Sequence, residues 1–320
     1  MWRYALKRLL LIVPTFLGVS VIIFVLLRAI PGDAALMLLR AGETGAGTFG
    51  AEAYEELRRE FGLDRPLWEQ YVIWLGGVLR GDWGESLYTG DPVIQQLAGR
   101  LPVTFELAVL TIALAWLIAI PAGVVSALKQ DTFADYIARL VPIAFLSMPN
   151  FWIGTVLIMV PALFWKYLPP LHYIPVYENP GQNLLQFLFP ALSLGAFSSA
   201  VLARLTRSAM LEVLRQDYIR TAWAKGLREG TVIYRHALKN ALIPVVTVAG
   251  LQFNGLLGGT VILETLYGLP GVGSLTLLAI NQRDYPQVQA NVVFFASAYV
   301  LINLAMDLFY AALDPRIRYQ

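Results

Sequence analysis

The densest group of chemically active side chains in this sequence is basic. Between residues 204 and 239 eight lysines and arginines stand against three acids. The basic residues are Arg204, Arg207, Arg215, Arg220, Lys225, Arg228, Arg235 and Lys239. Because the sequence shows no nucleophile with a base, no metal cluster and no phosphate-cradling loop, this basic segment favours binding to a partner or an anionic surface over catalysis. The chain has no cysteine, which excludes disulfides, thiolate metal sites and cysteine nucleophiles.

The basic segment has helix signals of its own. Asp217 is a good N-cap and Gly226 a good C-cap residue, which predicts a short helix between them. A second short helix is predicted from Thr231 to Pro244. Two helices joined by a glycine turn favour an ordered docking surface, since a glycine lets a partner approach the backbone closely. The alternative is a loop that only fixes membrane orientation or touches anionic lipid.

The elements that hold this segment are membrane spans. Hydrophobic residues make up 57% of the 320 residues and charged residues only 14%, with a mean hydropathy of +0.60. Soluble domains carry about a quarter charged residues. Six apolar stretches are long enough to cross a hydrocarbon core of about 30 Å. They are Leu9 to Leu27, Leu107 to Leu128, Leu140 to Trp165, Leu184 to Ala203, Ala241 to Leu263 and Val288 to Met306.

The charge distribution predicts that both termini are cytoplasmic. In that arrangement the basic segment is cytoplasmic, and the two short outer loops hold only Lys166 and Arg283. The first stretch follows a basic N-terminus like that of a secretory signal. Its apolar run is too long and no small-residue cleavage site follows, so we expect a retained span.

The prediction divides the chain into an N-terminus with the first span (1–30), an extracytoplasmic helical insertion (31–100) and a core domain with the other five spans (101–320). Within the core, the basic cytoplasmic loop covers 204–243. In the insertion, 41–50 reads as loop, 51–63 and 66–79 as helices, and 80–86 as a turn. The insertion either shields the span ends or docks an external partner.

Helix breakers and polar residues mark several predicted spans. Prolines, which usually cause a kink or line a cavity, occur at Pro14, Pro121, Pro142, Pro149, Pro161 and Pro190. Gly255 and Gly259 have the spacing of closely packed helices. Asn150, Gln252 and Asn254 are polar groups in otherwise apolar spans, which makes them candidates to line a path through the membrane, with interhelical hydrogen bonding as the alternative.

Nothing in the pattern indicates an enzyme. Three acids, Glu106, Glu264 and Asp307, lie near span ends, where structural roles are favoured over substrate contact. His172 and His236 fall on opposite sides of the membrane in this topology and cannot share a metal. "GETGAGT" from Gly42 lacks the lysine of a phosphate loop. We therefore expect no ATPase site, no cofactor and no nucleic-acid partner in this chain.

The basic segment and several other stretches of the sequence resemble those of a known family. "RTAWAKGL" and "RHALKNALIP" resemble the EAA loop of the dipeptide and oligopeptide ABC transporter permeases, with Arg220, Thr221 and Ala222 in place of Glu-Ala-Ala and Gly226 as the motif's glycine. The first two residues depart from the generic motif. Further resemblance lies in "RAIPGDAA", "GLDRPLWEQYVIWLGGVLRGDWGESL", "SMPNFWIG", "ETLYGLPGVGSLTLLAINQRDYP" and "ALDPRIRY", which together span nearly the whole chain.

The resemblance implies an all-α polytopic membrane protein with the type I ABC importer permease fold, in a bacterial or archaeal inner membrane. It implies a homologous second permease, two cytoplasmic ATPase subunits or domains that bind ATP and magnesium, and an extracytoplasmic solute-binding protein. The coupling helix would contact the ATPase through Arg220, Thr221, Ala222, Lys225, Gly226 and Leu227. The cargo stays open among dipeptides, longer peptides, glutathione, nickel complexes and oligosaccharides.

Two other functions remain as alternatives. One is a secondary carrier or channel driven by an ion gradient, although no carboxylate falls at the centre of a predicted span. The other is a membrane scaffold without solute flux. We expect six spans to form only half of a translocation unit, since a substrate path usually needs more helices around it, and this predicts a homodimer or a paired second permease.

Overall fold

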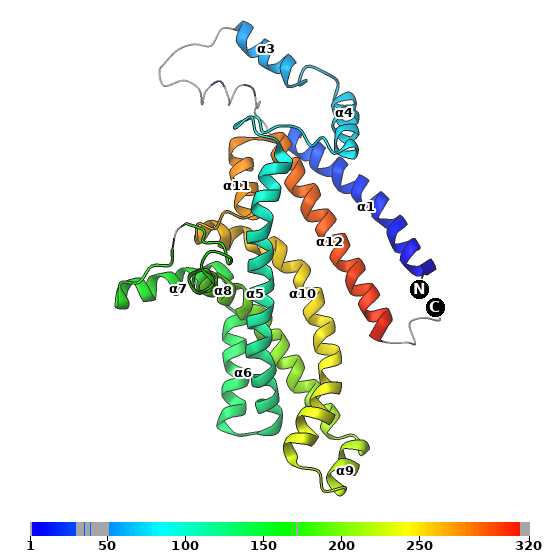
Figure 1. Cartoon of the computed structure of the whole chain (residues 1–320), viewed down its shortest axis with the longest axis vertical. Coiled ribbons are helices and arrows are strands. Elements are labelled where there is room, and N and C mark those ends of the chain that lie inside the picture. Colours follow the sequence, from blue (N-terminus) through cyan, green and yellow to red (C-terminus); the bar gives the residue numbers. More distant parts are fainter. Residues whose placement is uncertain (1, 30–34, 36–38, 40–50, 171, 314–320) are drawn as a thin grey trace. The chain divides into compact units, whose positions relative to one another are not determined.

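The computed structural model describes residues 2–29, 35, 39, 51–170 and 172–313 (Figure 1). The regular elements of these ranges are helices, with one isolated bridge between Glu85 and Pro92. The helices are α1 Trp2–Ala29, α3 Ala51–Glu60, α4 Leu67–Arg80, α5 Val93–Leu128, α6 Phe133–Leu146, α7 Asn150–Trp165, α8 Pro180–Leu214, α9 Asp217–Ala224, the π-helix η1 Thr231–Leu238, α10 Lys239–Leu266, α11 Val272–Gln282 and α12 Tyr285–Leu313. The prediction of an all-helical chain is confirmed for the described residues.

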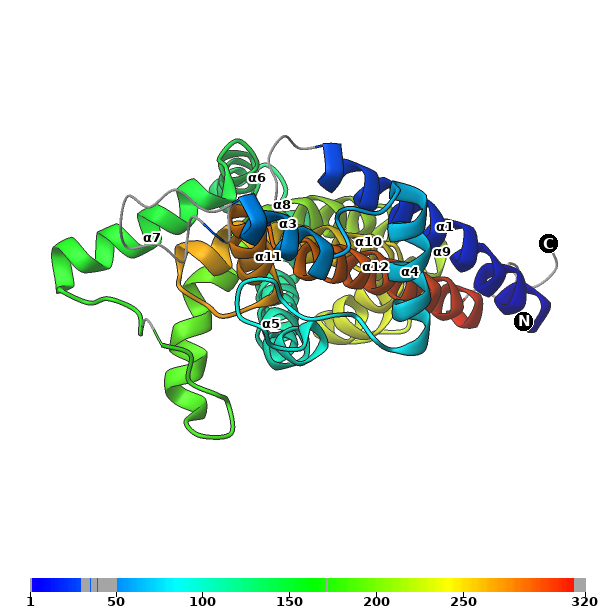
Figure 2. The ribbon, with the colours of Figure 1, turned by 90° about the horizontal axis from the view of Figure 1, so that it is seen from above.

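The chain forms two compact units. The first comprises Met1–Pro102 with Gly271–Gln320, and the second comprises Val103–Pro270. In the first unit α1 and α12 lie side by side in both views, and α11 packs on α12 (Figures 1 and 2). The buried core of this unit consists of Leu27, Ala279, Tyr285 and Val288. Apolar faces that meet in this way hold the first and last helices of the chain together.

Asp284 connects the helices of the first unit to the segment that follows α4. Its carboxylate accepts a hydrogen bond from the Ser86 hydroxyl and one from the backbone N–H of Gln287 at 3.3 Å, so it also caps α12. Both Asp284 and Ser86 are buried. The predicted turn 80–86 is therefore anchored by a specific polar contact.

The second unit is built around α8. This helix is largely buried and packs against α6, α7 and α10, while two apolar clusters join α5, α8 and α10. Gly123 permits the closest approach of α5 to α8, because an added Cβ would lie 2.5 Å from Cβ of Thr206. Such contact between small residues is typical of helices packed within a membrane.

Among the described residues, three helices are long and apolar enough to cross a membrane: Val93–Leu128, Pro180–Leu214 and the described part of α12, Tyr285–Ala305. A fourth span results if α6 and α7 count as one. Val13–Ala29 of α1 is a shorter apolar helix. The predicted stretch Ala241 to Leu263 lies inside α10.

The predicted span from Leu140 to Trp165 is interrupted in the structure, and its residues belong to two helices, α6 and α7. The chain breaks between α6 and α7 and bends by 105°. Pro149 explains the break, because proline has no N–H and disfavours helical backbone in the residue before it. Pro142 and Pro161 lie inside helices, so only one of these three prolines ends a helix. The expected kink is thus confirmed at Pro149.

The two helices predicted in the insertion are confirmed as α3 and α4. The stretch 41–50, predicted as loop, lies outside the described residues. Gly259, predicted to pack, belongs to a part of α10 whose side chains are not described. A Cβ added at Gly255 would meet nothing within 4 Å among the described residues, so the predicted close packing is not seen at this glycine.

Candidate functional site

The basic segment forms a short helix, α9, directly after the end of α8. Asp217 is its first residue, and the N-cap position belongs to Gln216, so the prediction of Asp217 as the N-cap is wrong by one residue. The Asp217 carboxylate instead lies 3.4 Å from the Arg220 guanidinium. Both side chains are exposed, and such a pair stabilises a helix by only about 0.3–0.5 kcal/mol.

The predicted stop at Gly226 is confirmed. Its φ is +72°, a left-handed conformation that disfavours residues with a Cβ. Gly226 N–H donates to the Trp223 carbonyl at 2.9 Å, and Leu227 N–H donates to the Ala222 carbonyl at 3.4 Å. This pair of bonds is the Schellman motif, which fixes where α9 ends and how the chain turns.

The second predicted helix begins at Thr231 as expected but does not end at Pro244. It starts as the π-helix η1 and continues into α10 without a break, with Pro244 inside that helix. The site is therefore joined directly to α10.

One face of α9 is buried in a cluster that includes the ends of the long helices. Ile219 and Ala222 are 0% and 6% exposed, and they pack with residues of α5, α8, η1 and α10. These residues are Val124, Ala127, Ala209, Met210, Val232, Ile233, Ala237 and Ala241. A force on α9 is therefore applied to several helices at once, since close-packed side chains transmit displacement.

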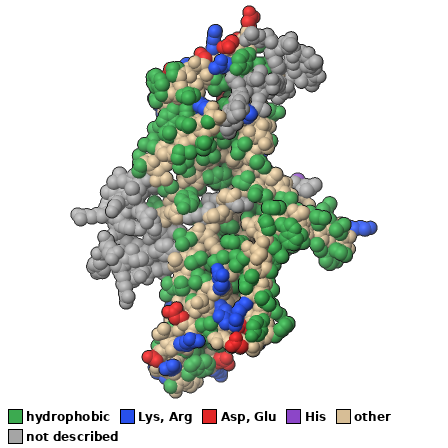
Figure 3. Space-filling view, turned by 180° about the vertical axis from the view of Figure 1, so that it is seen from behind, with side chains coloured by type: hydrophobic (Ala, Val, Ile, Leu, Met, Phe, Trp, Pro, Cys, Tyr) green, Lys and Arg blue, Asp and Glu red, His purple; other side chains and the backbone are tan. Residues whose placement is uncertain are grey.

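The other face of α9 is exposed. Arg220, Thr221, Lys225, Gly226 and Leu227 are all accessible, whereas Ala222 is buried. Three exposed aromatic rings accompany them, on Tyr218, Trp223 and Tyr234. Figure 3 shows charged side chains gathered at this end of the second unit. Aromatic rings and arginines together are enriched at protein interfaces, so the surface has the chemistry of a docking site.

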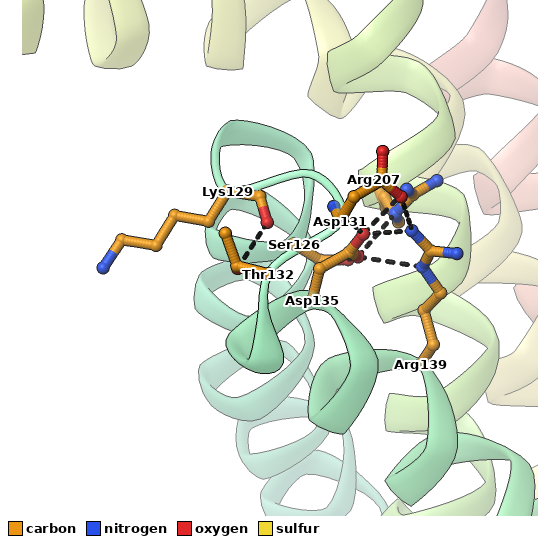
Figure 4. A network of polar contacts seen from close by, with 7 residues as sticks. All are labelled: Ser126, Lys129, Asp131, Thr132, Asp135, Arg139 and Arg207. Carbon is orange, nitrogen blue, oxygen red and sulfur yellow. Dashed lines mark hydrogen bonds and ion pairs between the residues drawn. The ribbon is translucent and has the colours of Figure 1, made fainter.

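A buried ion-pair network lies close to this site in the same unit (Figure 4). The Asp135 carboxylate is 0% exposed and contacts the guanidinium groups of both Arg139 and Arg207, the latter at 3.1 Å. It also accepts a hydrogen bond from the Ser126 hydroxyl at 2.5 Å and from the Asp131 backbone N–H at 3.0 Å. The network joins α5, α6 and α8.

This network was not predicted from the sequence, because the third span was predicted to begin at Leu140, which placed Asp135 in a loop. The spacing of Asp135 and Arg139 is a helical pair that sequence could have revealed. Arg207 lies 72 residues from Asp135, and only the packing of α6 on α8 brings the two together.

A cavity of about 330 Å³ lies between α7, α8 and α10. Its polar lining is uncharged and comes from Asn150, Ser198 and Gln252. Gln252 Oε1 is buried and has no hydrogen-bond partner among the described residues. The structure thus brings together two of the three predicted path residues, while the side chain of Asn254 is outside the description.

The acids near the span ends have hydroxyl partners. Thr104 donates to Glu264, which is 0% exposed, at 2.7 Å. Tyr173 donates to Glu106 at 3.2 Å. Burial and, after it, the negative charge of Glu106 raise the pKa of Tyr173 to about 12, so the phenol keeps its proton and remains a donor at neutral pH. The side chain of Asp307 is not described.

Two family models match the chain. Residues 119–319 match the binding-protein-dependent transport system inner membrane component, and residues 1–108 match the N-terminal part of such components. The dipeptide transport system permease protein DppB of Alkalihalophilus pseudofirmus is 38% identical over 345 residues, covering all of both chains. The glutathione transport system permease protein GsiC of Pectobacterium atrosepticum is 40% identical over 320 residues, again covering both completely.

Solved structures agree on the fold. The MetNI methionine ABC transporter in an inward-facing conformation matches with a TM-score of 0.54 and 16% identity, covering 70% of this chain and 98% of that one. An amino acid ABC transporter matches with a TM-score of 0.50 and 14% identity, covering 70% and 94%. The chain belongs to the family of binding-protein-dependent transport system inner membrane components, the permease subunits of ABC importers.

Proposed function

We propose that this chain is one of two homologous permease subunits of an importer for peptides or similar small solutes. ATP hydrolysis takes place on two separate cytoplasmic ATPase subunits, and an extracytoplasmic solute-binding protein delivers the cargo. The observation that carries the proposal is α9, which is anchored on one face and exposes cations and aromatic rings on the other. The names of the relatives, which are dipeptide and glutathione permeases, support a peptide cargo.

In this proposal α9 is the coupling helix. Arg220, Thr221, Lys225 and Leu227 contact the ATPase, and Gly226 sets the turn that presents them. Ala222 supports the surface from beneath, because its side chain packs in the buried cluster. Nucleotide binding changes the position of the docked ATPase, and the cluster carries that change to α5, α8 and α10. Only a partner that docks differently in its two states can shift the permease between conformations.

The proposed topology has six spans and both termini in the cytoplasm. In this topology the N-terminus and the first span comprise residues 1–30, and the external insertion comprises residues 31–100. The core comprises residues 101–320 and includes the coupling loop at 204–243. The lysine and arginine distribution supports this orientation. It places the exposed side chain of Lys225 inside the cell and that of Lys166 outside.

We further propose that Asn150, Gln252 and Asn254 line the translocation path. The cavity beside Asn150 and Gln252 supports this role, since its uncharged amides both donate and accept hydrogen bonds. Uncharged amides can form hydrogen bonds with the backbone of a peptide whatever the charge on the side chains of that peptide. The solute-binding protein then performs most of the selection.

Single-cysteine variants test the proposal cleanly, because the natural chain has no cysteine. Lys225→Cys and Lys166→Cys replace exposed lysines on the two proposed sides. A membrane-impermeant maleimide applied to intact spheroplasts should label residue 166 and spare residue 225. In inverted vesicles that contain the whole transporter, a maleimide that carries a photoreactive benzophenone bonds to the thiol and, on illumination, inserts into a neighbouring C–H bond. It should link residue 225, and not residue 166, to an ATPase subunit.

External labelling of residue 225 would refute the topology. Correct sidedness without a cross-link to any ATPase would refute coupling through α9. Uptake into proteoliposomes that needs only an ion gradient would establish the secondary-carrier alternative instead. The proposal requires that uptake begins only when ATPase, solute-binding protein and ATP are all present.

A further inference from the structure

The first unit contains a second cavity, of about 320 Å³. Its lining is charged, whereas the polar lining of the cavity beside Asn150 and Gln252 is uncharged. Three arginines line it, Arg28, Arg59 and Arg65, and none of the lining residues that the structure describes is acidic. We propose that this cavity binds the phosphate headgroup of an anionic membrane phospholipid. The inference is independent of the transport cycle and of the cargo.

Arg28 is held in place as an anion-binding group. Its Nε donates to Oε1 of Gln70 at 2.9 Å, and the guanidinium carbon lies 3.6 Å from the centre of the Phe24 ring. The Gln70 amide is itself fixed by a bond to the Arg65 carbonyl at 2.8 Å. The guanidinium therefore has one orientation before any ligand arrives, which lowers the entropy cost of binding.

Two buried donors in this lining lack acceptors. Nη1 of Arg28 and Nε2 of Gln289 have no hydrogen-bond partner among the described residues. A buried donor without a partner is unfavourable, and the penalty is larger for a charged group. An oxyanion in the cavity would accept from both donors, and charge-assisted bonds from a guanidinium to phosphate are among the strong ones.

The surroundings point to a lipid as the source of that oxyanion. Arg28 is in the last turn of α1, directly after a run of exposed apolar side chains that includes Val21, Ile22, Val25 and Leu26. This is the depth at which arginine side chains reach the membrane interface. A phosphate bound to Arg28 would therefore lie at the level of lipid headgroups.

Helix α4 has the surface of a helix that lies in the interface. None of its residues is buried, and large apolar side chains on it are exposed, with Leu67, Trp68, Val72 and Ile73 all above 50%. Ile73 and Trp74 also line the cavity. Apolar surface next to the cationic cavity offers acyl chains a place to pack, which a free phosphate ion does not need.

Binding of dioctanoyl phosphatidylglycerol to the purified full-length chain, followed by native mass spectrometry, tests this proposal. Arg28→Gln should weaken binding about tenfold or more, because it removes the charge of the central donor. Arg59→Gln should weaken it about fivefold through loss of one cation near the lipid surface. Arg80→Gln is the matched control, since Arg80 is an exposed arginine of α4 outside the cavity lining.

Arg28 also contacts Phe24 and Gln70, so the Arg59 variant keeps the test valid if Arg28→Gln fails to fold. Equal binding by the wild type, Arg28→Gln and Arg59→Gln would overturn the proposal, as would an equal loss in Arg80→Gln. A second series uses inorganic phosphate and a peptide rich in glutamate. Binding of either as tightly as the lipid would overturn the assignment of a lipid, in favour of a free anion or an acidic protein surface.

Discussion

Gly226 is the residue at which backbone conformation and proposed coupling meet. Its φ of +72° costs about 1 kcal/mol or more for a residue with a Cβ, although no atom stands within 4 Å of that position. Gly226→Ala should therefore strain the turn without a clash and displace Lys225 and Leu227. We expect ATP-driven uptake by the reconstituted transporter to fall about fivefold, the factor that 1 kcal/mol corresponds to.

Gly230 provides the matched control for this prediction. It is exposed, has open space around its Cβ position and belongs to the same segment, but its φ is −57°. Gly230→Ala should leave uptake unchanged, since alanine is favoured in helical backbone. Equal effects of the two alanines would show that the left-handed turn is irrelevant to coupling.

The residue scale also shows what sequence can reveal. Gly226 was predictable because a glycine that follows a helix-forming run is a local signal. The burial of Ala222 was not, because it depends on η1 and the ends of α5 and α8. The resemblance to the EAA loop placed Ala222 among residues that contact the ATPase, whereas the packing gives it a supporting position.

At the scale of elements, Asp135 is the main electrostatic link between α6 and α8. Asp135→Asn would leave the guanidinium groups of Arg139 and Arg207 without their shared carboxylate. Removing one partner of a buried ion pair destabilises a protein by about 3–5 kcal/mol. We expect a clear decrease in the thermal unfolding temperature of the purified chain in detergent, accompanied by loss of uptake.

Asp131→Asn is the control for that variant. Asp131 also lies within 3.4 Å of the Arg139 guanidinium, but its side chain is 81% exposed. Its φ is +57°, a conformation that asparagine tolerates well. Its replacement should change stability by less than about 1 kcal/mol, as for other exposed pairs. If both variants unfold at the same temperature, the buried network does not hold α6 on α8.

Elements were predictable where their signals are local and unpredictable where packing decides. Helical spacing located α3 and α4. The proline pattern predicted a kink in the third span but did not distinguish Pro149, where the chain breaks, from Pro142 and Pro161. Sequence could not reveal the continuity of η1 with α10, because Pro244 is normally a stop signal and the π-helical turn leaves no mark in composition. The contact between Asp135 and Arg207 required the fold itself.

At the scale of the molecule, the proposed coupling surface and the proposed solute path occupy different places in the second unit. The α9 surface belongs to one buried cluster, with the ends of α5, α8 and α10, while the cavity with Asn150 and Gln252 is lined from α7, α8 and α10. Helices α8 and α10 contribute to both. A movement of α9 can therefore reach the cavity through helices that are already packed against it, without any separate connecting element.

This separation predicts that the route can be damaged while the coupling stays intact. Gln252→Leu replaces an amide whose buried Oε1 has no partner among the described residues with an apolar side chain of similar size. Replacing an unsatisfied polar group in this way is neutral or stabilising, so the unfolding temperature should stay the same or rise. Uptake should fall about tenfold, the effect of one lost hydrogen bond to the solute of about 1.4 kcal/mol.

The neighbouring Leu251→Ala is the control for Gln252→Leu, because Leu251 is 56% exposed and does not line the cavity. It should transport normally. ATP hydrolysis should still be stimulated by the solute-binding protein in both variants, since α9 is unchanged. The interhelical alternative makes the opposite prediction: a glutamine that holds helices together would lower the unfolding temperature when replaced by leucine. A stable Gln252→Leu protein with normal uptake would remove this residue from the path.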